Sequence, residues 1–279
     1  TDVLLGPNSI LFGSDAMGGV IHFHTRTPRV GREMVSAKFS TAFRSPNQST
    51  MIHGDLECSG LNWASLTSIS HSQYGDLRMG EWRRHGDEKW GLDSVYVERE
   101  NNTDYIRNNE DASLQVGSGY DQTDVLQKLR YQSQRGVWDL NLQWSISSDI
   151  PRYDVSFETS DGNPKWATWN YGPQRRSLAS LRYGSSITNW DIAWNTVVSF
   201  QSIEESRIKR RFGSEWQETQ RENVDVWNAY TTFSKGFYND FNVTAGINIG
   251  WDAVTSEASL LNIETEEMKR ADTRYPNGG

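Results

Sequence analysis

The chain has 279 residues, of which 35% are hydrophobic and 12% are aromatic, and its formal net charge is -8. A polar chain this rich in Trp, Tyr and Phe is not typical of a disordered protein, because disordered segments contain few aromatic side chains. The acidic balance argues against a nucleic-acid partner, since phosphate binding depends on Lys and Arg. The single cysteine, Cys58, excludes an internal disulfide, and no Cys/His cluster has the spacing of a zinc site.

The first 28 residues form a glycine-rich segment that differs from the rest of the chain. A short apolar run is followed by Pro7, which suits the first position of a helical turn. Gly13 ends this turn, and the pair Gly18 and Gly19 leads into a strand over residues 20–25. The pattern predicts a compact unit of strand, turn and strand.

From residue 33 onward, apolar and polar residues alternate with a period of two. Such alternation predicts strands that bury one face and wet the other. We expect nine strands, many of them too long for an ordinary sandwich. They cover residues 33–44, 49–58, 61–74, 120–134, 138–147, 176–184, 190–201, 223–234 and 237–251.

The connections between these strands alternate in length, which is typical of outer-membrane β-barrels with long external loops. Short connections are expected at 45–48, 59–60, 134–137, 185–188 and 235–236, and long ones at 75–119, 151–175 and 207–218. Trp138 and Trp144 lie toward opposite ends of one apolar stripe, as expected for aromatic girdles at two bilayer interfaces. Periodicity alone does not separate this barrel from a soluble β-sandwich, whose aromatic face would fill a dry core.

Residues 6–25 read GPNSILFGSDAMGGVIHFHT. This segment resembles the end of the plug domain of TonB-dependent outer-membrane receptors, where the pattern is G-P-x-S-x-L-Y-G-x-x-A-x-G-G-V-[IV]-N. Phe12 stands where Tyr is usual, and His22 stands where Asn is usual. The glycines and the immediate transition to alternating strands make the motif specific. Its matching positions include Gly6, Pro7, Ser9, Gly13, Gly18 and Gly19.

The resemblance implies an all-β fold, in which a plug domain lies inside an antiparallel transmembrane β-barrel of about 22 strands. We therefore expect a fragment, with the C-terminal end of the plug at residues 1–30 and the N-terminal part of the barrel, about nine strands, at 31–279. In this family the glycines serve the tight turns of the plug, because glycine permits positive φ.

The function implied by the resemblance is TonB-dependent uptake of a scarce ligand, most often a ferric siderophore, across the bacterial outer membrane. Haem, cobalamin and oligosaccharides remain open as ligands. The implied partners are the TonB complex, reached through a missing N-terminal segment, the ligand, and outer-membrane lipid and lipopolysaccharide. Neither a catalytic residue nor a cofactor is expected.

His22 and His24 are candidate ligand-binding residues because they share one face of the expected strand at 20–25. Paired imidazoles bind iron or haem in other proteins. The simpler interpretation is that both histidines are structural residues, hydrogen-bonded to their neighbours.

The expected long loop at 75–119 contains cationic and aromatic residues suited to an anionic, ring-bearing ferric chelate. The alternative is a solvated outer loop without a ligand. The candidate residues are Arg78, Trp82, Arg83, Arg84 and Trp90.

A basic run near the outer end of another strand suits the phosphates of lipopolysaccharide, although a solvated strand extension explains it equally well. The run consists of Arg207, Lys209, Arg210 and Arg211.

An enzyme is not indicated. Neighbouring acids such as Glu204 and Glu205 point to opposite faces of a strand and are poor acid/base partners. No nucleophile-elbow, zincin or P-loop motif is present. The better alternative is a soluble Trp-rich β-domain that binds carbohydrate, which would line a wet groove with its tryptophans instead of facing lipid.

Overall fold

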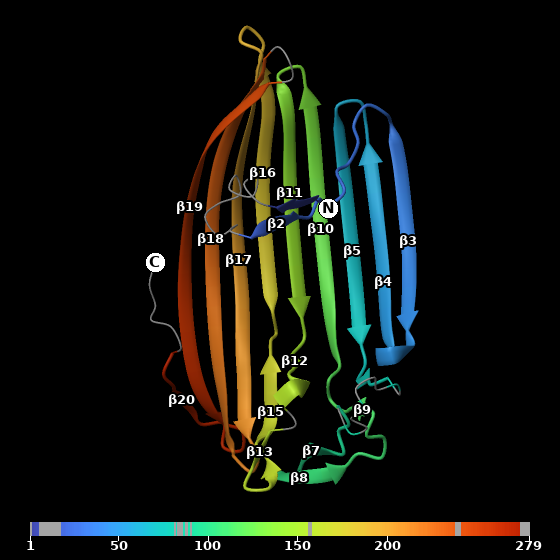
Figure 1. Cartoon of the computed structure of the whole chain (residues 1–279), viewed down its shortest axis with the longest axis vertical. Coiled ribbons are helices and arrows are strands. Elements are labelled where there is room, and N and C mark those ends of the chain that lie inside the picture. The colour runs from blue at the N-terminus through green and yellow to red at the C-terminus, as the bar shows by residue number, and fades with distance from the viewer. Residues whose placement is uncertain are drawn as a thin grey trace.

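The structure is a computed structural model that describes residues 2–5, 18–80, 82, 86, 89, 91–155, 158–237 and 241–273. Within these residues, twelve strands form one sheet, in which nine long antiparallel strands follow one another in chain order (Figure 1). The long strands are β3 (Met34–Arg44), β4 (Ser49–Ser59), β5 (Trp63–Tyr74), β10 (Tyr120–Ser133), β11 (Gly136–Ser147), β16 (Arg175–Ile187), β17 (Ile192–Arg211), β18 (Trp216–Gly236) and β19 (Asn242–Asn262). Three short strands complete the sheet: β12 (Ile150–Pro151), β15 (Trp166–Tyr171) and β20 (Met268–Arg270).

The other strands form separate pairs. These pairs are β1 (Asp2–Leu5) with β2 (Gly19–His22), β6 (Leu77–Arg78) with β9 (Leu114–Gln115), β7 (Val95–Glu100) with β8 (Thr103–Asn108), and β13 (Thr159–Ser160) with β14 (Asn163–Pro164). Two 3-10 helices, η2 (Ser45–Asn47) and η3 (Tyr153–Val155), are single turns. None of the helices in the described part of the chain is long and apolar enough to cross a membrane.

The predicted antiparallel barrel wall of about nine strands is confirmed. The expected long connection at 207–218 is wrong, because β17 continues to Arg211 and pairs in register with β18 from Gln217 onward. These strand ends carry charged residues on both faces, so the apolar alternation that marks a strand is missing there. Two expected turns also shift, since β16 extends to Ile187 and β18 extends to Gly236.

The sheet has an inner face, against which residues 25–29 lie, and an opposite outer face. On the outer face, the cross-strand register aligns apolar residues from six neighbouring strands. We call this set the apolar row: Leu129, Leu140, Leu181, Val198, Ala229 and Ile249.

An aromatic row lies beside the apolar row, nearer the short turns. It consists of Tyr131, Trp138, Tyr183, Trp194 and Phe233, each from a different strand. Ring centroids are 4.3 Å apart for Trp138 and Tyr183, and 5.5 Å apart for Tyr183 and Trp194. A continuous line of aromatic rings across neighbouring strands is the arrangement of a membrane-interface girdle.

The outer face is uncovered across the described residues, which leaves large apolar side chains in contact with solvent. Phe39 is 72% exposed and Ile247 is 69% exposed, whereas the fully buried apolar residues are few and mostly small. A soluble β-sandwich needs a second sheet packed over such an apolar face. The sandwich alternative is therefore wrong for the described fold.

Residues 25–29 are fastened to the inner face by charged contacts, mainly with β4. The Arg26 guanidinium lies 2.7 Å from Asp55 and 3.5 Å from Glu57. The amide of Arg29 donates to Glu57 at 3.0 Å, and Lys128 on β10 donates to the Thr25 carbonyl at 3.1 Å. We call these contacts the tether, because they attach the segment after β2 to the wall.

Replacing Arg26 with alanine is expected to loosen the tether. Asp55 is 9% exposed, so it would lose its cation at a site with little water to replace it. Because the guanidinium is half-exposed, the loss of attachment free energy is limited to about 1 kcal/mol. This loss corresponds to about fivefold faster tryptic cleavage after Arg29. Arg107→Ala, which removes two ion pairs on the separate β7–β8 hairpin, is the control. Equal cleavage rates in Arg26→Ala and wild type would show that the tether is dispensable.

Candidate ligand-binding site at the loop end

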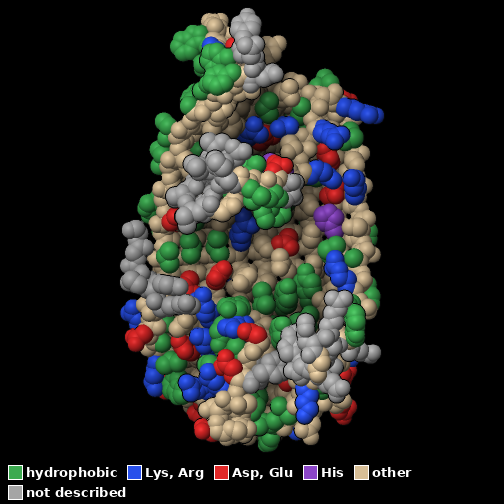
Figure 2. Space-filling model, viewed as in Figure 1, with side chains coloured by type: hydrophobic (Ala, Val, Ile, Leu, Met, Phe, Trp, Pro, Cys, Tyr) green, Lys and Arg blue, Asp and Glu red, His purple; other side chains and the backbone are tan. Residues whose placement is uncertain are grey.

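The two ends of the sheet differ in their connections. Short turns at 60–62, 134–135 and 188–191 occupy one end, which we call the turn end. The other end, called the loop end, carries the long segments 75–119 and 148–174 (Figure 1). Figure 2 looks onto the inner face and shows charged side chains of both signs gathered at the loop end.

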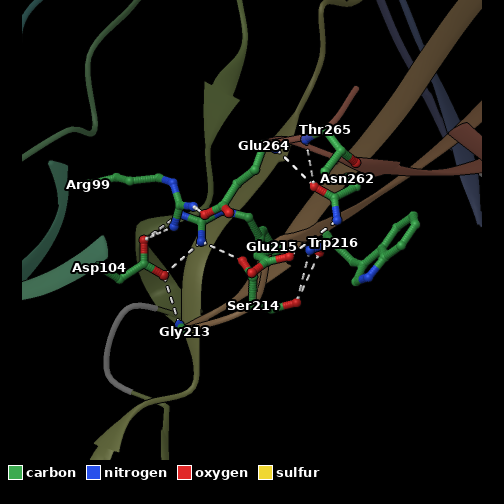
Figure 3. A network of polar contacts seen from close by, with 10 residues as sticks. Arg99, Asp104, Gly213, Ser214, Glu215, Trp216, Asn262, Glu264 and Thr265 are labelled. Atoms are coloured by element: carbon green, nitrogen blue, oxygen red, sulfur yellow. Dashed lines mark hydrogen bonds and ion pairs between the residues drawn. The ribbon is translucent and has the colours of Figure 1, made fainter. Parts of the chain in front are cut away.

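Asp104 on β8 holds the β7–β8 hairpin against the ends of β17 and β18 (Figure 3). Its carboxylate accepts hydrogen bonds from both terminal nitrogens of Arg210, at 2.7 and 2.9 Å, and from the Gly213 amide at 2.8 Å. Arg99 on β7 donates to the same carboxylate at 3.0 Å and to Glu264 at 2.7 Å. We call these five residues the loop junction.

The loop junction is dry at its centre, since the side chains of Asp104 and Arg210 are 0% and 5% exposed. Burial raises the pKa of Asp104, but the hydrogen bonds from Arg210, the Gly213 amide and Arg99 lower it by more. The pKa of Asp104 therefore lies below its ordinary value. The carboxylate is the charged partner that makes burial of Arg210 tolerable.

The turn between β17 and β18 and the turn between β19 and β20 are joined beside the loop junction. Asn262 accepts hydrogen bonds from the amides of Glu264 and Thr265, at 2.9 and 3.0 Å. Its side-chain amide donates to Glu215 at 3.2 Å (Figure 3). The β7–β8 hairpin is thus attached to the β17–β18 turn and to the β19–β20 turn, and these two turns are attached to each other. These contacts give the loop end a defined surface.

A pocket of about 310 Å³ lies between the two long loop segments. The segment 75–119 contributes Tyr96 and Gln115, and the segment 148–174 contributes Arg152, Trp166 and Trp169. Most of this lining is aromatic or polar. Such a composition suits a ring-bearing ligand held in a fixed orientation.

Cations stack on the tryptophans of this pocket. The Arg152 guanidinium lies 4.2 Å from the Trp169 ring centroid, and the Lys209 ammonium lies 5.3 Å from the same ring. Arg211 and Lys165 lie 5.8 and 5.2 Å from the Trp166 ring. Positive charge over aromatic faces can bind an anion by charge and an aromatic ring by stacking.

Arg152 is held in place by Asp154, with hydrogen bonds of 2.9 and 2.5 Å. The hydrogen bonding from Arg152 is the main reason why the pKa of Asp154 lies below its ordinary value. Both groups are charged at neutral pH. The ion pair with Asp154 therefore fixes the orientation of the Arg152 guanidinium in the pocket.

Of the five loop residues predicted to bind a ligand, the structure describes two, Arg78 and Trp82. Arg78 is paired with Asp111 and also donates to Ser113 at 3.0 Å. Trp82 is 80% exposed. Arg83, Arg84 and Trp90 lie outside the described residues.

Sequence reasoning missed Arg152, Trp166 and Trp169. The available signal was the combination of Arg, Lys and Trp in the second long loop, facing the basic run on β17. That run is engaged within the chain: Arg207 pairs with Glu222 at 2.9 Å, and Arg210 pairs with Asp104. Its predicted contact with lipopolysaccharide stays a prediction.

The plug motif is partly visible in the β1–β2 pair. Gly6, Pro7, Ser9 and Gly13 lie outside the described residues, whereas Gly18 and Gly19 precede and begin β2. Gly19 has a φ of +149°, and a Cβ atom there would lie 2.9 Å from the carbonyl oxygen of Leu4. Only glycine fits this close approach of the two strands.

His22 and His24 come together with Asp2, which the sequence did not single out. Asp2 is the register partner of His22, and the Nε2 atom of His24 lies 2.6 Å from its carboxylate. The two imidazole centroids are 3.9 Å apart. We call these three residues the plug cluster.

Long antiparallel strands in simple meander order, with an apolar aromatic outer face and a polar inner face, define the class of outer-membrane β-barrels. The chain has the fold of part of a TonB-dependent receptor barrel. The resemblance found in the sequence is confirmed at the level of fold.

Comparisons with solved structures identify the individual neighbours. The copper transporter OprC matches with a TM-score of 0.69 and 13% identity, over 98% of this chain and 36% of that one. The ferric yersiniabactin uptake receptor FyuA from Yersinia pestis matches with a TM-score of 0.50 and 11% identity, over 85% of this chain and 36% of that one. The chain thus spans about a third of the length of both proteins. No protein-family model and no curated protein sequence matches it.

Proposed function

We propose that the chain is part of a bacterial outer-membrane receptor that takes up a scarce ligand with energy relayed by TonB. This proposal rests on one observation: the sheet has an apolar face and a polar face, and the tether holds residues 25–29 against the polar face. An apolar face suits contact with lipid, and the opposite polar face holds the segment that follows the plug-like strands. Residues 1–30 would be the end of the plug and 31–279 part of the barrel.

The pocket at the loop end supports a ferric siderophore as the ligand. Many siderophores are anionic ring-bearing chelates, which match the cations stacked on Trp166 and Trp169. FyuA takes up a ferric chelate and OprC transports copper, so both kinds of cargo are compatible with this fold. The aromatic lining of the pocket, with Arg152 as its cation, favours the chelate.

Uptake is tested in a Gram-negative strain that lacks its own siderophore receptors and expresses the whole protein. We expect cell fractionation to place the protein in the outer membrane. Radioactive iron should enter these cells as a ferric tris-catecholate, and a protonophore should abolish entry while surface binding remains. Entry that ignores the protonophore, or a protein found outside the outer membrane, would refute the proposal.

Trp169→Ala is expected to weaken binding of the anionic, aromatic ferric tris-catecholate about tenfold, since loss of stacking and of the cation–π contacts costs about 1.4 kcal/mol. Fluorescence quenching of the purified protein measures the dissociation constant. Trp216→Ala is the matched control, because Lys269 stacks on Trp216 at 4.2 Å outside the pocket. A ferric tris-hydroxamate, which has no aromatic ring, should bind more weakly. Identical affinities for both variants would exclude the pocket as the binding site.

A further inference from the structure

We propose that the plug cluster binds a divalent transition-metal ion, of the kind represented by Cu²⁺ and Zn²⁺. Asp2, His22 and His24 each offer one ligand atom, and the three atoms lie within 4.8 Å of one another. The site differs from the pocket at the loop end. It joins residues separated by about twenty positions in the chain through the pairing of β1 with β2.

The arrangement of the plug cluster follows from strand geometry. The rings of His22 and His24, two positions apart in the chain, lie side by side with centroids 3.9 Å apart. Asp2 stands directly opposite His22 in the ladder. His24 lies two residues beyond the end of β2, so its side chain is outside the constraint of the ladder.

The distances need little change to accommodate an ion. Imidazole nitrogens and carboxylate oxygens lie about 2.0–2.2 Å from a tetrahedral metal, so two ligand atoms on one ion are about 3.3–3.6 Å apart. His24 and Asp2 are already closer than this, at 2.6 Å, through a hydrogen bond. An ion would take the place of the shared proton, and His24 and Asp2 would move apart by about 0.7–1 Å to bind it.

The ligand chemistry selects the class of metal. Two imidazoles and one carboxylate favour Cu²⁺ or Zn²⁺ over the hard ions Ca²⁺ and Mg²⁺, which prefer oxygen ligands. Three protein ligands leave a further position open for water or another donor. All three residues are exposed, which gives an ion access from solvent.

The site lies close to the tether, because Arg26 follows His24 by two residues. A bound ion would stabilise the pairing of β1 with β2 immediately before the point where the chain attaches to the wall. Metal binding is independent of the proposed uptake function. It is measured on the purified protein without a siderophore or TonB.

The test is a titration of the detergent-purified, metal-free protein with Cu²⁺, followed by electron paramagnetic resonance. We expect one tight equivalent whose spectrum shows coupling to imidazole nitrogen, and Zn²⁺ should compete for it. His22→Ala and His24→Ala should each weaken binding by about tenfold to a hundredfold, because even loss of a group that only orients a ligand costs that much. Asp2→Asn should weaken binding and leave the nitrogen coupling intact.

His71→Asn is the matched control, since His71 lies on β5 and is hydrogen-bonded to Thr123 at 2.9 Å. This variant should bind Cu²⁺ like the wild type. Heat-dependent mobility on gels verifies that each variant keeps its folded barrel. The proposal is overturned if no tight equivalent exists, or if His22→Ala/His24→Ala binds as tightly as the wild type.

Discussion

Asp104→Ala is expected to release the β7–β8 hairpin from the loop end of the sheet. The substitution removes the buried carboxylate that accepts four hydrogen bonds, three of them from arginine side chains. Arg210, 5% exposed, would then be a buried charge without this partner. Breaking a buried pair from one side costs about 3–5 kcal/mol.

Limited proteolysis measures the release directly. A loss of about 3 kcal/mol corresponds to roughly a hundredfold faster tryptic cleavage after Arg99, because local opening exposes the hairpin. Glu98→Ala is the control on the same hairpin, since Glu98 pairs with Arg107 at the exposed surface, where an ion pair contributes little to stability. Unchanged cleavage in Asp104→Ala would mean that other contacts hold the hairpin.

Acid should reproduce the effect of the substitution. The folded protein holds the pKa of Asp104 below its ordinary value of 3.8, so the stabilisation is complete above that pH and is lost as the pH falls below it. Cleavage of the hairpin by pepsin should therefore rise in the wild type as the pH falls below about 4. Asp104→Asn, which has no charge to lose at this position, should show a smaller rise. Parallel pH profiles would contradict the role of the carboxylate.

Val198→Arg is expected to impair assembly of the barrel, whereas Ser199→Arg should be tolerated. Val198 belongs to the apolar row and stands between Leu181 and Ala229 on the outer face. If this row lies at the middle of the bilayer, an arginine there costs about 2–4 kcal/mol. Ser199 is the adjacent residue on β17 and stands between Ser180 and Asn228 on the inner face.

The two variants add the same charge one position apart, so they differ only in the face that receives it. Refolding into lipid vesicles, followed by heat-dependent gel mobility, measures the folded fraction. A cost of about 3 kcal/mol corresponds to roughly a hundredfold loss in the folding equilibrium of Val198→Arg. Ser199→Arg should stay within about 1 kcal/mol of the wild type. Equal losses in both variants would show that the outer face does not contact lipid.

The strands and their faces were determined by the sequence itself. Alternation of apolar and polar residues is a local property, and one period-two run such as that of β11 specifies both the strand and the side that each residue faces. Trp138 therefore appeared in the expected stripe and joined the aromatic row. Gly19 was also singled out from the sequence, through the motif shared with the plug family, and in the structure a Cβ atom there would lie 2.9 Å from the carbonyl oxygen of Leu4.

Only the tertiary structure decided where the long loops make their contacts. Asp104 and Arg210 are 106 positions apart, and nothing near either residue marks the other as its partner. Asp2 met His22 through the register of β1 with β2, and Trp169 gained Lys209 when β15 paired with β17. Such contacts depend on how distant segments fold over the end of the sheet. A local sequence pattern does not predict that arrangement, whereas the residues of a strand by themselves show its period of two.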